Sequence, residues 1–467
     1  MRLGKSRRTL WLLLSGRWAI FASVIAYVFL LTWIYREMIS PRWAGYGFTY
    51  EDPETLASVV GWIGALLPAF WMPLAITRPS QALYWQLYLT VYLPSMFIPY
   101  YMASTPLSKL VPVTVYLFAG FALVGLQYRI PLRSMPVAHI TTDQFWGVLA
   151  VSYMLTMGPY LIQYAPHLRL VSFTERYELR LADREVDSGI LMGYCRNWLA
   201  FTLNPLLLSI GLLRRRPALF LMGAAGAVLL YASAASRAWL IVVAYLPMVY
   251  FAFRKNDGKR FGLLMLFITN CLFLFIIGLE LFGSSYGQDF SDLFAFRDHS
   301  VPGAFTEQYA RFFETHPFTY WSHVKGINLL IQFPYEHTIP FEVGNFLSPG
   351  NTDLSANAHL WATDGIAAIG PVGILVISFP LALVFYLLDC CTKRHAPWVS
   401  GLIVIMQYAN LANIGLVSTV FGGGLLFTTF LLWLMPPSVG EGVTAMAARG
   451  RVQNRNHYQN SWPTPSI

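Results

Sequence analysis

The residues best suited to chemistry lie in one stretch of the chain, Asn357–Gly373, which contains His359, Asp364, Gly370 and a final Gly373. A histidine titrates near neutral pH, so His359 can take the proton of an attacking hydroxyl group. A histidine just before an apolar segment can also serve only as a hydrogen-bonding residue at a membrane boundary. The local sequence leaves both roles open.

The chain around this stretch is too apolar for a protein that folds in water. Of its 467 residues, 56% are hydrophobic and 12% are charged, whereas a soluble domain carries about 25% charged residues. The mean hydropathy is +0.50. The net charge of +9 does not indicate nucleic-acid binding, because Lys and Arg form short clusters between apolar runs and no recognition motif accompanies them. The composition predicts an all-α, polytopic membrane protein.

About twelve segments are long enough to cross a bilayer, since a spanning helix needs about 20 apolar residues. The break between the seventh and eighth rests only on the short polar stretch 233–237. The first segment follows a basic N-terminus and is too long for a signal peptide, so a retained helix is expected. The segments lie at about 16–35, 56–76, 82–102, 109–127, 144–165, 190–213, 217–235, 238–253, 260–282, 366–388, 397–417 and 419–436.

Positive charges predict the orientation of these segments, because cytoplasmic connections are enriched in Lys and Arg. With the N-terminus inside, every even-numbered connection is basic, and both termini are expected to be cytoplasmic. Merging the seventh and eighth segments would move a basic connection to the outer side of the membrane, so the charges favour twelve separate segments. The residues concerned are Arg78, Arg129, Arg133, Arg214, Arg215, Arg216, Arg254, Lys255, Lys259, Arg260, Lys393 and Arg394, with Arg449, Arg451 and Arg455 in the tail.

Three sizeable connections are expected on the outer side, at about 36–55, 166–189 and 283–365. The third is rich in aromatic residues, His, Pro and Gly, and a connection of that length is usually functional or disordered. Its aromatic content favours a folded loop. We therefore predict a single transmembrane domain over residues 1–436, followed by a polar, disordered cytoplasmic tail at 437–467.

At His359 a resemblance to a known family emerges. His359, ten further residues, Gly370, two residues and Gly373 resemble the signature of the O-antigen ligase and O-antigen polymerase superfamily, which lies at the end of a large periplasmic loop. In the ligase form an Asn follows the His directly. Here Leu360 follows and Asn357 precedes, which favours a polymerase.

Two further segments are similar to the same superfamily. Ser236-Arg237 is similar to its Ser-Arg pair, and the stretch from Phe296-Arg297 through Arg311 to His316-Pro317 is similar to the Arg-containing part of polymerase loops. By resemblance, Arg237 and Arg297 (or Arg311) would hold a diphosphate, which guanidinium groups bind through bidentate hydrogen bonds. His359 would act on the acceptor hydroxyl. An Arg near a membrane boundary is otherwise often a snorkelling anchor.

The resemblance implies the following activity. The enzyme would be an inverting, metal-independent glycosyltransferase of the lipid-dependent, GT-C-like fold in the bacterial inner membrane, without a cofactor. Its substrates would be undecaprenyl-diphosphate-linked repeat units of an O-antigen or exopolysaccharide, joined at the outer face of the membrane. Membrane lipids surround such an enzyme, and a chain-length regulator is a candidate partner.

Other polar residues have two interpretations each. Arg176, Arg180 and Arg184 share helical spacing and would line a phosphate path or belong to a solvated helical face. Asn357 and Asp364 are further candidate substrate contacts. For the polar residues inside the apolar segments, hydrogen bonds between helices are favoured over substrate contacts. These residues are Asn197, Asn204, Gln407, Asn410 and Asn413.

Three alternative functions remain open. An O-antigen ligase would differ in its acceptor. A transferase using polyprenyl-phosphate-linked sugars would use an acidic first loop, and the sequence Glu51-Asp52-Pro53-Glu54 fits that position. A transporter or flippase is less favoured, because we find no internal repeat and no convincing buried acid–base pair in the sequence.

Overall fold

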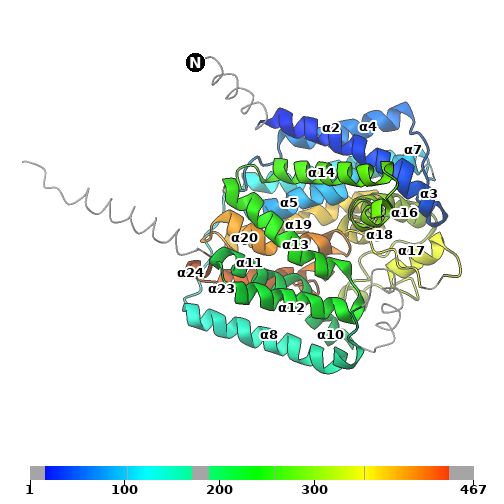
Figure 1. Ribbon diagram of the computed structural model, residues 1–467. Helices are drawn as coiled ribbons and strands as arrows, with labels where there is room; N and C mark the ends of the chain where they lie inside the picture. The colour runs from blue at the N-terminus through cyan, green and yellow to red at the C-terminus, as the bar shows by residue number, and fades with distance from the viewer. Residues whose placement is uncertain are drawn as a thin grey trace, which may run out of the picture. The chain divides into compact units, whose positions relative to one another are not determined.

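The computed structural model describes residues 16–102, 104–170, 189–256, 258–284, 286–351 and 353–440. The regular structure of these residues is entirely helical and includes no β-strand (Figure 1). The all-α prediction is therefore confirmed. The contacts divide the chain into two compact units, and each unit combines segments that are far apart in the sequence.

The first unit comprises Met1–Arg133, Ala252–Cys390 and Gln407–Gly423. Its helices are α2 (Arg17–Ile34), α3 (Ser40–Trp43), α4 (Thr55–Leu66), α5 (Ser80–Leu87), α6 (Leu93–Tyr101), α7 (Leu107–Leu126), α14 (Phe261–Leu281), α15 (Tyr286–Phe290), α16 (Val301–Thr315), α17 (Ile339–Leu347), α18 (Ala367–Ile369), α19 (Pro371–Cys391), α21 (Gln407–Leu411) and α22 (Leu416–Phe421). π-Helical turns at Tyr35–Ile39, Tyr88–Tyr92, Ser291–Ser300 and Trp361–Ile366 extend several of them.

The centre of the first unit is the continuous helix formed by α5, a π-helical turn and α6. Every residue of it is buried, including the polar residues Gln81, Gln86 and Thr90. Its tyrosine hydroxyls donate to main-chain carbonyls of neighbouring helices: Tyr84 to Phe121 (2.9 Å), Tyr88 to Ala65 (2.7 Å) and Tyr92 to Gly64 (2.8 Å). The rings can therefore be buried without leaving a polar group unpaired.

The third predicted outer loop, 283–365, is folded, as the sequence suggested, and it contains an interior helix. α16 packs against α6, and almost all of its residues are buried. The interior position was not predicted, because Glu307, Gln308 and Arg311 interrupt the apolar pattern of α16. The residues on either side of α16 are thereby brought close to the centre of the unit.

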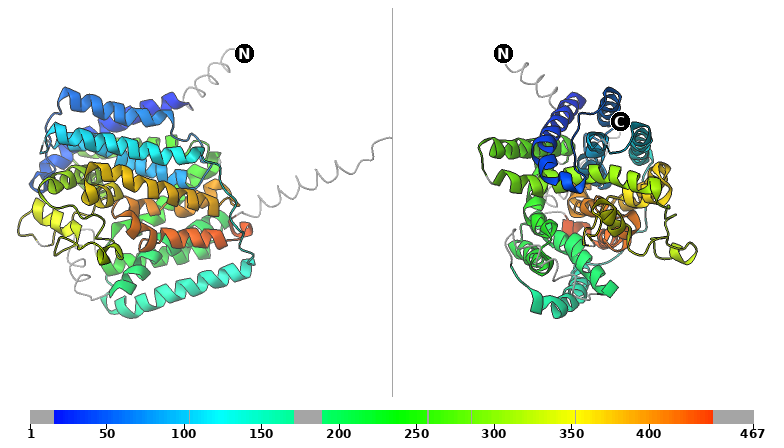
Figure 2. Two further views of the ribbon diagram at one scale, coloured as in Figure 1. Left: turned by 180° about the vertical axis from the view of Figure 1, so that it is seen from behind. Right: turned by 90° about the vertical axis from the view of Figure 1, so that its right-hand side faces the viewer.

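The second unit comprises Ser134–Phe251, Cys391–Met406 and Gly424–Ile467. Its helices are α8 (Thr142–Tyr164), α10 (Gly189–Trp198), α11 (Asn204–Arg214), α12 (Pro217–Ala234), most of α13 (Arg237–Asn256), α20 (Pro397–Val404), α23 (Leu425–Leu434) and α24 (Pro437–Gly440). α8 is long and uninterrupted (Figure 2) and begins with a capping box between Thr141 and Gln144. α11 and α12 pack closely at Gly223. A methyl group there would lie 2.8 Å from the carbonyl oxygen of Asn204, so the approach depends on the absence of a side chain.

All the predicted apolar segments coincide with helices or with runs of short helical pieces. The uncertain break at 233–237 is present: α12 ends at Ala234, and Ala235 adopts a left-handed conformation with φ of +50°. In the described part of the chain, seven helices are long and apolar enough to span a membrane, as in a polytopic membrane protein. They are Arg17–Tyr46, Leu107–Arg129, Thr142–His167, Pro217–Ala234, Phe261–Leu281, Pro371–Cys391 and Leu416–Leu434.

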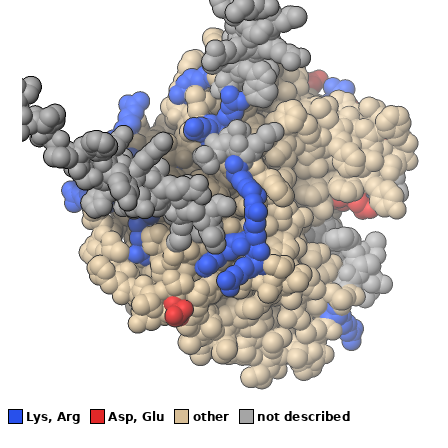
Figure 3. All heavy atoms as spheres, turned by 60° about the vertical axis from the view of Figure 1, so that its left-hand side comes forward, with Lys and Arg blue, Asp and Glu red and all other residues tan. Residues whose placement is uncertain are grey.

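The basic connections of the first unit meet at one end of it. The N–H of Ile76 donates to the carbonyl of Gly258 (3.0 Å), and Arg78 Nη2 donates to the carbonyl of Ile130 (2.7 Å), so three connections lie together. These connections and their flanks carry Arg78, Arg129, Arg133, Arg254, Lys259 and Arg260. Basic side chains are also more frequent than acidic ones on the face drawn in Figure 3.

Candidate functional site

The site is built around a break in the last segment of the first unit. Residues 412–415 separate α21 from α22, and Gly415 is extended, with φ of −61° and ψ of 160°. The N–H of Leu416, which begins α22, donates to the carboxylate of Asp364. Non-helical backbone inside a membrane protein needs such partners. A methyl group on Gly415 would overlap the same carboxylate, so the absence of a side chain allows this approach.

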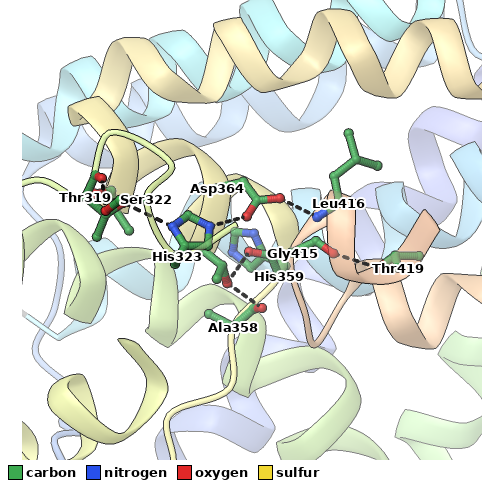
Figure 4. Close-up of polar contacts among 11 residues, drawn as sticks. Thr319, Ser322, His323, Ala358, His359, Asp364, Gly415, Leu416 and Thr419 are labelled. Carbon is green, nitrogen blue, oxygen red and sulfur yellow. Dashed lines mark hydrogen bonds and ion pairs between the residues drawn. The ribbon is translucent and has the colours of Figure 1, made fainter. Parts of the chain in front are cut away.

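Asp364 also binds a histidine that the sequence did not point to. His323 Nε2 lies 2.9 Å from Asp364 Oδ1, and His323 Nδ1 lies 3.2 Å from Thr319 Oγ1 (Figure 4). The Thr319 hydroxyl can also donate to the carbonyl of Ala367 at 3.1 Å. The side chain of His323 is 16% exposed and that of Asp364 is 2% exposed. The arrangement is a buried carboxylate that orients a partly accessible imidazole.

Arg297 is attached to the same helix break. It is exposed, lies in the π-helical turn Ser291–Ser300, and donates from Nη2 to Asn413 Oδ1 at 3.1 Å. Arg297 and Asp364, both predicted as site residues, are thus bonded to residues only three apart, Asn413 and Leu416. The structure brings a guanidinium group and a histidine–carboxylate pair to one short stretch of backbone.

His359 lies in the interior five residues before Asp364, and its side chain is fully buried (0% exposed). Nδ1 accepts from the N–H of Ala362 at 3.3 Å, so the proton is on Nε2, which donates to Thr306 Oγ1 at 2.9 Å. The Thr306 hydroxyl in turn donates a hydrogen bond to the carbonyl of Pro302 at 3.0 Å. Burial lowers the pKa of His359 to about 3, so the ring is neutral and only weakly basic. A catalytic role for His359 stays a prediction.

The glycines of the motif have structural roles in this arrangement. Gly370 has φ of +77°, a conformation that side chains rarely adopt, and it ends the short helix α18. A methyl group on Gly373 would overlap the main chain of Gly365, so α19 starts in close contact with the π-helical turn that carries Asp364. The spacing from His359 to Gly373 therefore fixes the position of Asp364.

Arg311 is engaged differently from Arg297. It is half-buried in α16, with Nε 3.9 Å from the fully buried carboxylate of Glu307 and its guanidinium over the ring of Phe346 at 5.4 Å. Glu307 also accepts from Thr105 at 2.5 Å. Burial raises the pKa of Glu307. Arg311 therefore faces an interior carboxylate, and Arg297 is the more exposed of the two arginines.

The remaining predicted residues are less informative. Arg237 begins α13 in the second unit, but its side chain is not among the parts that the structure describes. Three further predicted residues lie wholly outside the described residues: Arg176, Arg180 and Arg184. Asn357 is half-buried, two residues before His359. Among the described residues, no group of three or more His, Cys, Asp or Glu side chains is placed to hold a metal ion.

His323 and Thr319 were missed because they stand outside the motif, in a stretch without helical or strand periodicity. One signal was available: Asp364 is a lone carboxylate beside an apolar run, and such a group must find a partner. The partner that it finds, His323, lies 41 residues earlier in the sequence, so only the fold identifies it. Comparison of the chain with protein-family models, with curated proteins and with solved structures finds no match to any of them.

Proposed function

We propose that this protein is a polysaccharide polymerase that joins undecaprenyl-diphosphate-linked oligosaccharide repeat units. The observation that carries the proposal is the attachment of exposed Arg297 and the His323–Asp364 pair to one helix break, Asn413–Leu416. A guanidinium group suits a diphosphate leaving group, and a histidine suits an acceptor hydroxyl. The motif from His359 to Gly373 supports the same assignment through its resemblance to O-antigen polymerases.

The position of the site relative to the basic connections supports action at the outer face of a bacterial inner membrane. α19 begins next to the site, at Pro371, and near its other end Tyr386 accepts from the N–H of Arg133 at 3.3 Å, in a basic connection. A helix of 21 residues is about 31 Å long, close to the thickness of the hydrocarbon core. If basic connections are cytoplasmic, the site is at the outer surface.

The proposed reaction is a direct displacement. Arg297, with Arg237 as the second candidate, would stabilise the charge that develops on the leaving diphosphate. A hydroxyl group of the acceptor repeat unit attacks the anomeric carbon from the opposite side, which inverts its configuration. His359 supports the acceptor side of the site from the interior. The proposal includes about twelve membrane crossings, a GT-C-like fold, no metal ion, and a chain-length regulator as a candidate partner.

The orientation predicts the behaviour of reporter fusions. A reporter enzyme that folds only outside the cytoplasm should be active when fused after Phe318 and inactive when fused after Lys259 or Arg451. The reason is that Phe318 follows α16 in the predicted outer segment, whereas the other two follow basic segments. Activity of the Lys259 fusion would contradict the twelve-crossing arrangement.

Deletion of the gene separates the proposed function from its alternatives. We expect loss of long polymer, with single repeat units accumulating on the lipid carrier at the outer face. Loss of a ligase would instead leave long polymer on the carrier, and loss of a flippase would leave single units on the cytoplasmic side. Extraction of lipid-linked glycans, sized by gel and tested for access to an external glycosidase, distinguishes the three patterns.

A further inference from the structure

We propose that His323 takes the proton of the acceptor hydroxyl, and that Asp364 and Thr319 hold its ring in position. The inference rests on the proposed function and identifies the base of the same reaction. His323 lies between α16 and α17, outside the motif that carries the family resemblance.

Access distinguishes the two histidines near the helix break. The His323 side chain is 16% exposed, whereas His359 is 0% exposed and both of its ring nitrogens are hydrogen-bonded within the protein. A base must come within about 3 Å of the proton that it removes. Part of the His323 side chain is open to a substrate hydroxyl, whereas the lone pair of buried His359, on Nδ1, accepts from the N–H of Ala362.

The hydrogen bonds around His323 suit both protonation states of its ring. In the neutral ring, Nε2–H donates to Asp364 at 2.9 Å, and Nδ1 carries only the longer, 3.2 Å contact with Thr319. The Thr319 hydroxyl can turn to the carbonyl of Ala367 (3.1 Å), which releases the Nδ1 lone pair. Once Nδ1 is protonated, it can donate to Thr319 Oγ1 while Thr319 still donates to Ala367. The imidazolium charge is then balanced by Asp364.

The backbone before His323 is strained in a way that fixes its position. Tyr320 and Trp321 both have left-handed conformations, with φ of +48° and +59°. Large side chains rarely adopt this region, and residues held in it cluster at functional sites. Two main-chain hydrogen bonds hold the turn against the segment after Asp364: Thr319 N–H to Ala367 (2.8 Å) and Tyr320 N–H to Ala368 (3.1 Å).

The oxygen of the acceptor hydroxyl forms a bond to the anomeric carbon of the donor glycan, and the bond from that carbon to the diphosphate oxygen breaks. The bonding electrons leave with undecaprenyl diphosphate. The hydroxyl proton moves to Nδ1 of His323 and is later released to water.

The test uses the full-length protein in detergent and undecaprenyl-diphosphate-linked repeat units purified from cells that lack it. His323→Ala should reduce the rate of polymer formation by about 10²–10⁴-fold, the usual contribution of a general base. His323→Gln should form polymer as slowly as His323→Ala, while its melting temperature should stay near that of the parent protein. His337→Ala is the matched control, since His337 is exposed in the same segment, and it should keep the parental rate.

Added imidazoles should restore part of the activity of His323→Ala, and the restored rate should rise with the pKa of the imidazole. A residue that only fills space would give no such dependence.

Asp364→Asn should slow polymer formation by the parent enzyme. It should cause little further loss of rate in the His323→Ala variant, because the effects of residues that act as a unit are not additive. An active parent protein with a fully active, folded His323→Gln variant would overturn the inference and leave the proposed function standing. A folded parent protein that forms no polymer would instead overturn the proposed function itself.

Discussion

Replacing Arg297 with alanine is expected to abolish most polymer formation while the protein still reaches the membrane. Arg297 is exposed, and its hydrogen bond to Asn413 Oδ1 (3.1 Å) lies at the surface, so the fold should tolerate the substitution. Removal of one group that stabilises developing charge typically costs about 10²–10³-fold in rate. Arg297→Lys should recover little, because a point charge does not reproduce the planar guanidinium fork. The measurement is polymer formed per amount of membrane-inserted protein.

Arg36→Ala provides the matched control for Arg297→Ala. Arg36 is another exposed arginine of the first unit. It forms an exposed ion pair with the neighbouring Glu37 at 2.7 Å and lies over the ring of Tyr50 at 6.0 Å, and such surface contacts contribute little to stability. Arg36→Ala should therefore leave the amount of polymer unchanged. Arg237→Ala should resemble Arg297→Ala if both residues bind the diphosphate. Near-normal polymer from the protein that carries both alanine substitutions would remove diphosphate binding by these residues from the proposal.

His359→Ala is expected to have a comparably large effect, through the position of Asp364. The substitution removes the bond to Thr306 and opens a cavity at the start of the π-helical turn that carries Asp364. Misplacement of a catalytic group by about 1 Å can cost about 10²-fold in rate. Single repeat units should accumulate on the lipid carrier. Both the polymer and the melting temperature of the purified protein should be measured.

The melting temperature separates the structural role of His359 from direct catalysis. We expect His359→Ala to melt below the parent protein, since it creates a buried cavity and leaves Thr306 without this partner. Thr306→Val should also reduce polymer formation, as His359→Ala does, because it removes the same hydrogen bond. Unchanged polymer from His359→Ala would show that the motif histidine neither positions the site nor takes part in the reaction.

The helical architecture could be predicted because it follows from hydropathy and local backbone preferences. The break at Ala235 was predicted from a few polar residues and from the charge of the connection at 254–260, and the structure has it. α16 could not be predicted as an interior helix, because its polar residues Glu307 and Arg311 find partners that are visible only in the fold. Thr105, which hydrogen-bonds to Glu307, is 202 residues away in the sequence.

The candidate site was predicted only in part, for a related reason. Asp364 and Arg297 were identified from the motif and from a segment with a family resemblance, and the structure connects both to the break at residues 412–415. That connection depends on contacts across 52 and 116 residues of sequence. His323 meets Asp364 across 41 residues, and its turn depends on two left-handed residues that no local preference favours.

The central claim is that the protein transfers glycans from a lipid-linked diphosphate without a metal ion. The most direct measurement is incubation of the purified protein with undecaprenyl-diphosphate-linked repeat units, with and without a metal chelator. We predict long polymer and one released undecaprenyl diphosphate per unit joined in both conditions, with Glu51→Gln and Asp52→Asn as active as the parent protein. Loss of polymer on adding the chelator, together with inactive Glu51 or Asp52 variants and an active His359→Ala protein, would contradict the claim and favour a transferase with an acidic first loop.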